Sequence, residues 1–301
     1  MLKIFTSPVR SFNFQLFLPP VMKKLIPLLI ISFLFSISGY SQMEEYVQEG
    51  EFGITAGLSH YFGDLDNRGA INHPKGAFGA YFRKQFGNYT AIRISGNYAF
   101  LAYSDKYSNN LYQQRRNLSF NTNVFEFTLQ GDFNFFKFIP TDRAHAFTPY
   151  ATLGVGFFSY NPYAYYQNQK VYLRPLHTEG ETFYEGRKEY GSIAMCFPIG
   201  FGVKYAITDQ VNLSFEVTQR FTTTDYIDDV SKTYIGINNF PSTAGGKSLA
   251  GIMQDRSYET GTPIGIEGRQ RGFSKQNDQY ATAVIGISFN ITSYRCPSAK
   301  P

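Results

Sequence analysis

The chain has 301 residues, of which 43% are hydrophobic, 18% are aromatic and only 17% are charged, with a formal net charge of +5. This composition excludes a disordered protein, because such chains carry many charges and few aromatic side chains. Two cysteines and four histidines are too few for a disulfide-rich scaffold or a histidine-rich metal centre.

Residues 1–41 have the pattern of a targeting sequence. Met22, Lys23 and Lys24 precede an apolar run over 25–35, and small residues follow at 38, 39 and 41. The run is shorter than the ~20 residues of a membrane helix, which favours a signal peptide. We predict that residues 1–41 are a presequence and signal peptide, cleaved before Gln42, and that 42–50 form a periplasmic N-terminal segment.

Cleavage of this segment would change the charge balance. Of the 28 basic residues in the chain, four lie in 1–41, which leaves 24 against 23 acidic residues and a net charge of +1. Binding to nucleic acid needs a large basic face, so we expect no nucleic-acid partner.

The remaining chain alternates between apolar and polar residues in eight segments. In one of them, Phe125, Phe127 and Leu129 share one face, while Glu126 and Thr128 share the other. Such alternation predicts strands, and the segments have about the ~9–11 residues of a tilted transmembrane strand. In chain order, the predicted strands cover residues 51–62, 75–86, 89–98, 124–136, 148–160, 193–206, 211–221 and 281–291.

Alternation alone fits either a soluble sandwich or a membrane barrel. Charges in the middle of the polar faces, with aromatic residues crowding the opposite faces, favour a barrel with a polar lumen. The predicted lumen charges are Arg83, Arg93, Glu126, Asp132, Lys204, Glu216 and Arg220. Eight strands leave an interior that side chains just fill, so we expect a paired structural network and no open solute channel.

The connections between the predicted strands alternate in length. Those at 87–88, 137–146 and 207–210 are short, and those at 63–74, 102–121, 161–192 and 222–277 are long. Bacterial barrels have short periplasmic turns and long outer loops. We therefore predict an all-β fold, an eight-stranded antiparallel up-and-down transmembrane barrel over 51–291 with long extracellular loops, in the outer membrane of a Gram-negative bacterium. Both termini, including a tail over 292–301, are expected in the periplasm.

This topology also bears on the two cysteines. Cys196 falls near the outer start of a strand, and Cys296 falls beyond the last strand at the opposite end. The two ends are ~25 Å apart, whereas a disulfide needs Cα atoms within ~7 Å. We expect no bridge between them.

An enzyme site at the outer rim would need a histidine beside an acid or a serine. His60 and Asp64 lie at the end of the first strand, and Asp225, Asp228 and Asp229 begin the longest connection. The simpler interpretation is that Asp64 and Asp66 shape a turn, and that Asp228 and Asp229 are solvated or cap a turn. Because the spacing is unspecific and no nucleophile stands out, we predict no enzyme, no catalytic, cofactor-binding or metal-ligating residue, no cofactor and no small-molecule substrate.

Two stretches resemble a known family. Residues 51–66 (EFGITAGLSHYFGDLD) resemble the first strand and loop of a barrel family of Bacteroidota, and residues 221–231 (FTTTDYIDDVS) resemble its segment after the seventh strand. The end of the chain, with Phe289, Ile291 and the tail that starts at Tyr294, is also similar. This is the PorG-like family of outer-membrane barrels of the type IX secretion system. The resemblance implies a non-enzymatic secretion component that anchors or positions a periplasmic ring of PorK–PorN-like proteins.

The resemblance assigns no contact residue, so topology has to indicate the partner surface. Contacts with the ring are expected on the periplasmic side, with the candidates Lys137, Arg143, Asp209, Gln210 and Arg295. Turn chemistry and solvation alone would also account for these residues. The other expected partners are outer-membrane lipid and lipopolysaccharide. Two alternatives remain open: a generic small barrel for envelope stability or surface adhesion, and a barrel enzyme that processes lipids or peptides.

Overall fold

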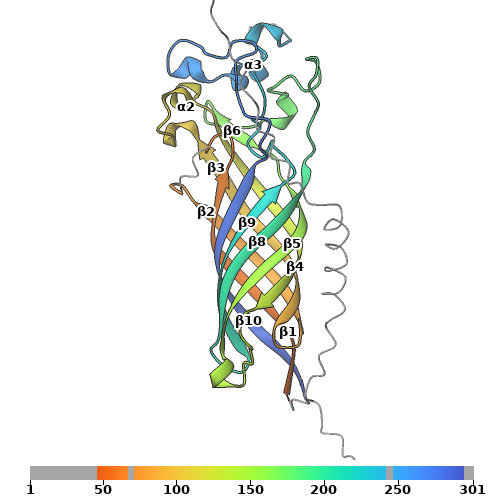
Figure 1. Cartoon of the computed structure of the whole chain (residues 1–301). Helices are drawn as coiled ribbons and strands as arrows, with labels where there is room; N and C mark the ends of the chain where they lie inside the picture. The colour runs from red at the N-terminus through yellow and green to blue at the C-terminus, as the bar shows by residue number, and fades with distance from the viewer. Residues whose placement is uncertain (1–45, 67–70, 242–246, 295–301) are drawn as a thin grey trace, which may run out of the picture. The chain divides into compact units, whose positions relative to one another are not determined.

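Eight long strands run up and down and close into a barrel (Figure 1). The computed structural model describes residues 46–66, 71–241 and 247–294. The predicted signal peptide and the candidate contact residue Arg295 lie outside these residues. The barrel strands are β1 (Tyr46–Phe62), β2 (Lys75–Phe86), β3 (Thr90–Ser104), β4 (Ser119–Asn134), β5 (Phe147–Ser159), β8 (Ile193–Ala206), β9 (Val211–Thr222) and β10 (Gln279–Tyr294).

Every neighbouring pair of strands around the barrel is antiparallel. Strands β1 to β5 pair in chain order, β5 pairs with β8, and β8 to β10 again pair in chain order. Strand β10 returns to β1 and closes the sheet. A closed sheet has no open edge, which is the condition for β structure inside hydrocarbon. The predicted eight-stranded antiparallel up-and-down barrel is confirmed.

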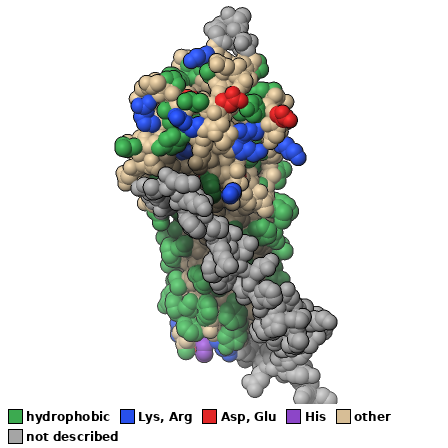
Figure 2. Space-filling view, turned by 45° about the horizontal axis from the view of Figure 1, so that its top comes forward, with side chains coloured by type: hydrophobic (Ala, Val, Ile, Leu, Met, Phe, Trp, Pro, Cys, Tyr) green, Lys and Arg blue, Asp and Glu red, His purple; other side chains and the backbone are tan. Residues whose placement is uncertain are grey.

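The barrel is apolar outside and polar inside. In β4, Phe125 and Phe127 are 58% and 55% exposed, whereas Glu126 and Asp132 on the opposite face are 1% and 4% exposed. Hydrophobic side chains cover the part of the barrel wall that is visible in Figure 2. Large apolar side chains all over the outside of a closed barrel indicate a wall that faces the hydrocarbon of a membrane.

Several strands are longer than the alternation indicated. Strand β1 begins at Tyr46 rather than at residue 51, β4 begins at Ser119 rather than at 124, and β10 continues to Tyr294 rather than ending at 291. The predicted segments 42–50 and 292–301 therefore each contribute residues to the barrel. The hydrocarbon layer imposes the apolar–polar pattern over only ~9–11 residues of a tilted strand. Beyond that layer the outer face meets water, so the pattern ends before the strand does.

The long connection over 161–192 contains a hairpin that the alternation did not reveal. Its strands are β6 (Tyr163–Tyr166) and β7 (Gln169–Tyr172). They are joined by Gln167 and Asn168, whose φ angles are +48° and +64°. Two successive left-handed residues make the tight turn that matches the twist of a hairpin, and asparagine adopts this conformation more readily than most residues. The available signal was the aromatic pattern on both sides of this Gln-Asn pair.

The remaining elements are short helices. They are η1 (Asp105–Tyr107), α2 (Leu111–Arg116), η2 (Arg143–His145), η3 (Arg174–Leu176), η4 (Ile237–Asn239), α3 (Leu249–Gln254) and η5 (Ser257–Glu259). None of the helices in the described ranges combines the length and the apolar composition needed to cross a membrane.

The long connections fold together at one end of the barrel. We call this assembly the loop cap; it consists of the described parts of 63–74, 105–118, 160–192 and 223–278, and includes α2 and α3 (Figure 1). Leu65, Leu118 and Ile227 are at most 4% exposed. They belong to one buried cluster with Tyr61 and Tyr280 from the ends of β1 and β10. The longest connection therefore folds over the mouth of the barrel.

A substitution at Gly57 tests the pairing of β10 with β1, which closes the barrel. A Cβ on Gly57 would lie 2.6 Å from the Cα of Val284 and closer still to the carbonyl oxygen of Ala283. We expect Gly57→Val to prevent closure, measured as loss of the folded species that resists SDS without heating. Gly96→Ala is the matched control, because a Cβ there meets no atom within 4 Å. Normal folding of Gly57→Val would contradict the β1–β10 register.

Candidate functional site

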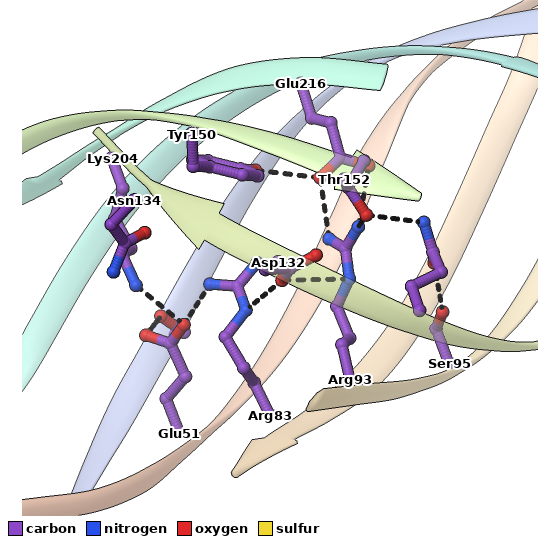
Figure 3. A network of polar contacts seen from close by, with 12 residues as sticks. Glu51, Arg83, Arg93, Ser95, Asp132, Asn134, Tyr150, Thr152, Lys204 and Glu216 are labelled. Atoms are coloured by element: carbon purple, nitrogen blue, oxygen red, sulfur yellow. Dashed lines mark hydrogen bonds and ion pairs between the residues drawn. The ribbon is translucent and has the colours of Figure 1, made fainter. Parts of the chain in front are cut away.

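A chain of ion pairs crosses the lumen (Figure 3). It joins one residue from each of six strands, in the order Lys204, Glu51, Arg83, Asp132, Arg93 and Glu216. Lys204 Nζ lies 3.2 Å from Glu51 Oε1, and Glu51 also pairs with Arg83. Asp132 Oδ2 lies 2.6 Å from Arg83 Nε and 3.5 Å from Arg93 Nε. Arg93 Nη1 ends the chain at 2.6 Å from Glu216 Oε2.

Neutral side chains add hydrogen bonds to this array. Tyr150 donates its hydroxyl to Glu216 at 2.8 Å, and Arg93 donates to Thr152 at 3.1 Å. Asn212 donates to Glu51 Oε2 at 2.7 Å. Three buried atoms of the array, Arg83 Nη2, Arg93 Nε and Asp132 Oδ1, have no hydrogen-bond partner among the described residues. The ion pairs and the other hydrogen bonds still join six strands from inside, as a structural network does.

The remaining predicted pair lies nearer the loop cap. Arg220 Nε is 2.7 Å from Glu126 Oε2, and the Tyr280 hydroxyl donates to the same oxygen at 2.5 Å. The thiol of Cys196 lies 3.5 Å from this oxygen. Cys196 is buried and free, while Cys296 lies outside the described residues.

The seven charges predicted for the lumen all face inward and have ionic partners. Glu51 is fully buried and was not among the predicted lumen charges. It was the first residue of a predicted strand and so looked like a strand end. Its register opposite Arg83 places it inside the barrel. Four cations thus face four carboxylates, and the lumen array is neutral.

Among the described residues, a small lumen cavity is lined by Tyr81, Arg93 and Glu216, with others. Its volume is about 30 Å³, which is room for about two water molecules. At the end with the short turns, Phe138 packs in a small buried cluster, with Lys204 Nζ 4.3 Å from its ring centre. With the loop cap over the other mouth, this arrangement suits a filled scaffold better than a pore.

Two buried arginines hold the loop cap together. Arg271 Nη1 donates to Glu179 Oε1 at 3.0 Å and to the carbonyl oxygen of Asp229 at 2.5 Å. Arg116 pairs with Asp105 at 2.7 Å and donates to the carbonyl oxygen of Arg271. These contacts join the connections 105–118, 160–192 and 223–278. Neither arginine was predicted, because Asp105 lies 11 residues from Arg116 in an irregular connection and the ionic partner of Arg271, Glu179, lies in another connection.

A single hydroxyl bridges two buried carboxyl groups under the cap. Tyr61 Oη lies 2.7 Å from Asp228 Oδ2 and 2.8 Å from Asp278 Oδ1, and all three residues are at most 1% exposed. A hydroxyl has one proton and donates to only one of them. The second contact needs a proton on the other carboxyl group, which then donates to Tyr61. The remaining carboxyl oxygens accept from the N–H groups of Val230 and Ile227.

The electrostatic surroundings agree with a retained proton. Burial raises the pKa of Asp278 to about 8, and the nearby charge of Asp64 contributes to the shift. Burial, followed by the charge of Asp278, raises the pKa of Asp228 well above its ordinary value. Desolvation and like charges both favour the neutral carboxylic acid. The junction between β1 and the longest connection thus holds a carboxyl proton at neutral pH.

His60 and Asp64, which were considered for an enzyme site, have different partners. His60 Nε2 pairs with Asp66 at 3.0 Å, while Asp64 accepts from the N–H of Phe273 at 2.9 Å. Asp228 and Asp229 were expected to be solvated or to cap a turn. Solvation is wrong, because they are 1% and 0% exposed within the loop cap. Asp228 does cap a turn, since its Oδ1 accepts from the N–H of Val230 at 2.9 Å. In the part of the chain that the structure describes, no group of three or more His, Cys, Asp or Glu side chains is arranged to hold a metal ion.

At the opposite end of the barrel, the short connections and β10 form a continuous surface. Arg143 Nη1 donates to the carbonyl oxygen of Ile207 at 3.1 Å. Asn290 of β10 donates to the carbonyl oxygens of Gln210 and Asp209 at 2.8 and 2.9 Å. We call residues 137–146, 207–210 and Asn290 the turn-end surface. Arg143, Asp209 and Gln210 are exposed there, and Lys137 is half-buried.

A closed barrel with an apolar exterior, a filled polar lumen and short turns at one end defines an outer-membrane β-barrel protein. The model of one family, described as a domain of unknown function (DUF6089), matches residues 28–236. The chain belongs to this family.

Three solved structures illustrate the likeness to other barrels. Neisserial surface protein A is 8% identical, with 82% of this chain and 100% of that chain covered and a TM-score of 0.40. Ail, the attachment invasion locus protein of Yersinia pestis, is 10% identical over 81% and 99%, with a TM-score of 0.35. OprG from Pseudomonas aeruginosa is 10% identical over 82% and 98%, with a TM-score of 0.33. Comparison with curated protein sequences gives no match. Sequence identities and TM-scores this low support no conclusion about function.

A substitution of Arg83 tests whether the ion pairs of the lumen array stabilise the barrel. Arg83→Met removes the cation shared by Glu51 and Asp132, and leaves both carboxylates buried with fewer partners. Breaking a buried pair in this way should lower the free energy of unfolding by ~3–5 kcal/mol, measured by urea unfolding of the full chain in micelles. Lys84→Met, one residue away, is the matched control. Its pair with Glu49, at 3.6 Å, has side chains that are 46% and 40% exposed, and such pairs contribute at most ~1 kcal/mol. Equal losses in the two variants would contradict a structural array.

The shared proton makes the stability of the loop cap depend on pH. An unfolded aspartate titrates near ~3.9, whereas the pKa of Asp278 in the fold is raised to about 8. Between these values the folded cap binds the proton and the unfolded chain does not. The cap is therefore most stable in acid and loses stability as pH rises from about 4 to about 8. Hydrogen-exchange protection of cap amides, corrected for intrinsic exchange, should fall accordingly.

The variant Asp278→Asn isolates the contribution of the shared proton to the pH dependence of cap stability. The asparagine amide donates to Tyr61 as the protonated acid does, and its oxygen still accepts from Ile227. Cap protection should therefore fall less steeply as pH rises. The dependence that remains comes from other buried carboxyl groups of the cap whose pKa is raised, such as Asp225 and Glu181. Asp209→Asn at the exposed turn end is the control and should keep the wild-type profile. An unchanged profile in Asp278→Asn would rule out the shared proton.

Proposed function

We propose that this protein is a non-enzymatic outer-membrane anchor of the type IX secretion system, and that it positions a periplasmic ring at the membrane. The observation that carries the proposal is the turn-end surface. Two segments expected separately to face the ring, 137–146 and 207–210, are joined there by the hydrogen bond of Arg143 to Ile207. Asn290 of β10 ties the second segment to the barrel through Gln210 and Asp209. A joined surface with exposed charge of both signs suits docking of a large protein better than isolated turns would.

The filled lumen supports anchoring over transport. The neutral array links six of the eight strands, and the described lumen cavity holds only about 30 Å³. A barrel cross-linked from inside resists distortion of its wall, which is what a fixed attachment point requires. Side chains just fill the interior of an eight-stranded barrel, which favours a fixed scaffold over a solute channel.

The sequence resemblance to PorG-like barrels supports the specific system. The two stretches that carry it, 51–66 and 221–231, meet in space at the contact between Tyr61 and Asp228. The two resembling stretches therefore lie on both sides of one contact, between the end of β1 and the start of the longest connection. In this proposal the turn-end surface and both ends of the barrel chain face the periplasm, and the loop cap faces outward.

A generic barrel for envelope stability or surface adhesion is the second candidate. The ordered loop cap favours it, because buried Arg116 and Arg271 hold the outer connections in one arrangement. In that case the cap, and not the turn-end surface, would carry the function.

Charge reversal at the turn-end surface distinguishes the two candidates. The tagged full-length protein is purified in mild detergent from its native outer membrane, and the co-purified proteins are identified. The double variant Arg143→Glu and Asp209→Lys should lose a large ring complex at least tenfold and should impair secretion. Lys188→Glu, an exposed cation in the loop cap, should retain both. A monomer with intact secretion in a deletion strain would leave the generic barrel.

A further inference from the structure

A pocket opens at the edge of the loop cap and has no part in the lumen array or in the turn-end surface. It has a volume of about 640 Å³ and lies between the start of the first connection, helix α2 and the end of the connection 223–278. We call it the rim pocket. The lining residues that matter below are Tyr112, Gln219, Gln270, Phe273, Gln276 and Gln279. Its volume is typical of small-ligand sites, which occupy ~300–1,000 Å³.

Strand alternation places the rim pocket on the outer side of the barrel wall. Arg220 and Tyr280 face the lumen and are 6% and 1% exposed, so the preceding residues Gln219 and Gln279 face outward. The two amides touch, with Gln219 Nε2 donating to Gln279 Oε1 at 3.0 Å. The next outward residue of β9 is Val217, which belongs to the exposed apolar wall. The pocket therefore begins where the apolar wall ends, at the level at which the headgroup layer of a membrane starts.

The charged residues of the pocket are already engaged. Arg116 and Arg271 donate to carboxylates and carbonyl oxygens inside the loop cap. Asp66 pairs with a histidine, and Asp64 accepts a backbone N–H. These two cations and two carboxylates leave the described lining without net charge. An anionic ligand such as a phosphate or a sulfate would find both of these arginines committed elsewhere, so the lining favours a neutral ligand.

The pocket offers neutral amides and aromatic ring faces instead. The side chains of Gln270 and Gln276 are exposed, and each amide group both donates and accepts hydrogen bonds. Phe273 and Tyr112 are 48% and 38% exposed, and Tyr112 is held by a hydrogen bond from its hydroxyl to the carbonyl oxygen of Gln270 at 2.6 Å. A sugar needs this combination, because its hydroxyls both donate and accept while its C–H faces pack on aromatic rings.

We propose that the rim pocket binds a neutral segment of a saccharide. Its position at the end of the apolar wall suits the sugar headgroup of an outer-leaflet glycolipid such as lipopolysaccharide. A free glycan would bring the same chemistry from solution. This site goes beyond the anchoring role, since it lies at the opposite end of the barrel from the turn-end surface and its test does not depend on the ring.

The test uses the full-length protein in phospholipid nanodiscs. One arm titrates it with fluorescent, delipidated oligosaccharide prepared from the lipopolysaccharide of its own membrane. The other arm measures enrichment of intact lipopolysaccharide over phospholipid in the co-purified lipid. Phe273→Ala and Gln276→Ala should each weaken binding at least tenfold, while Phe273→Tyr should keep it. Gln276 is exposed, so its truncation tests the site without endangering the fold.

Two control variants match these substitutions in kind. Tyr172→Ala removes an aromatic ring that is 43% exposed on β7, away from the pocket, and Lys275→Ala truncates the exposed neighbour of Gln276. Both should change affinity less than twofold. Binding of the soluble oligosaccharide supports the proposal with a free glycan as the source. Enrichment of intact lipopolysaccharide alone supports it with a lipid headgroup as the source.

Several results would overturn the proposal. They are the absence of saturable binding in both arms, equal preference for phospholipid, competition by inorganic phosphate, and a loss in Tyr172→Ala as large as that in Phe273→Ala. Loss of saccharide binding with intact ring capture would remove this site and leave the anchoring role standing.

Discussion

Charge neutrality in a narrow lumen is the constraint on which the rest of the structure depends. Eight strands enclose space for side chains but not for bulk water, so each inward charge needs a partner from another strand. Glu51 illustrates this requirement: it meets Arg83, Lys204 and Asn212, which come from β2, β8 and β9. The contacts that neutralise the lumen therefore also hold strands that are distant along the chain in one register.

Because side chains fill the lumen, partners are expected to bind at the two ends of the barrel. At one end the turns and β10 are hydrogen-bonded into a surface with exposed Arg143, Asp209 and Gln210. At the other end the connections fold over the mouth and extend the packing of the lumen upward through Tyr61 and Tyr280. The two ends differ in chemistry, since one is an exposed surface of mixed charge and the other a packed cap with a neutral, amide-lined pocket. They are suited to different partners.

The loop cap follows a different electrostatic rule from the lumen. Its arginines, Arg116 and Arg271, pair with Asp105 and Glu179, but the carboxyl groups of Asp228 and Asp278 lie together around one hydroxyl. In the cap, a retained proton neutralises one of these two carboxyl groups. In the lumen, arginine and lysine side chains neutralise the carboxylates. The stability of the cap is thus expected to respond to pH near neutrality.

The sequence by itself determined the eight strands, their up-and-down order and the seven charges that face the lumen. A period of two and the length of each connection are local properties, and both are imposed by a wall that separates hydrocarbon from a polar interior. The strand ends and the β6–β7 hairpin were not predicted. They lie outside the hydrocarbon layer, which imposes the alternation of apolar and polar residues. Only the tertiary structure decided which charges pair, how the loop cap is built and where the rim pocket opens. Tyr61 meets residues 167 and 217 positions away, and such contacts arise from closure of the sheet and packing of its loops, which no local pattern encodes.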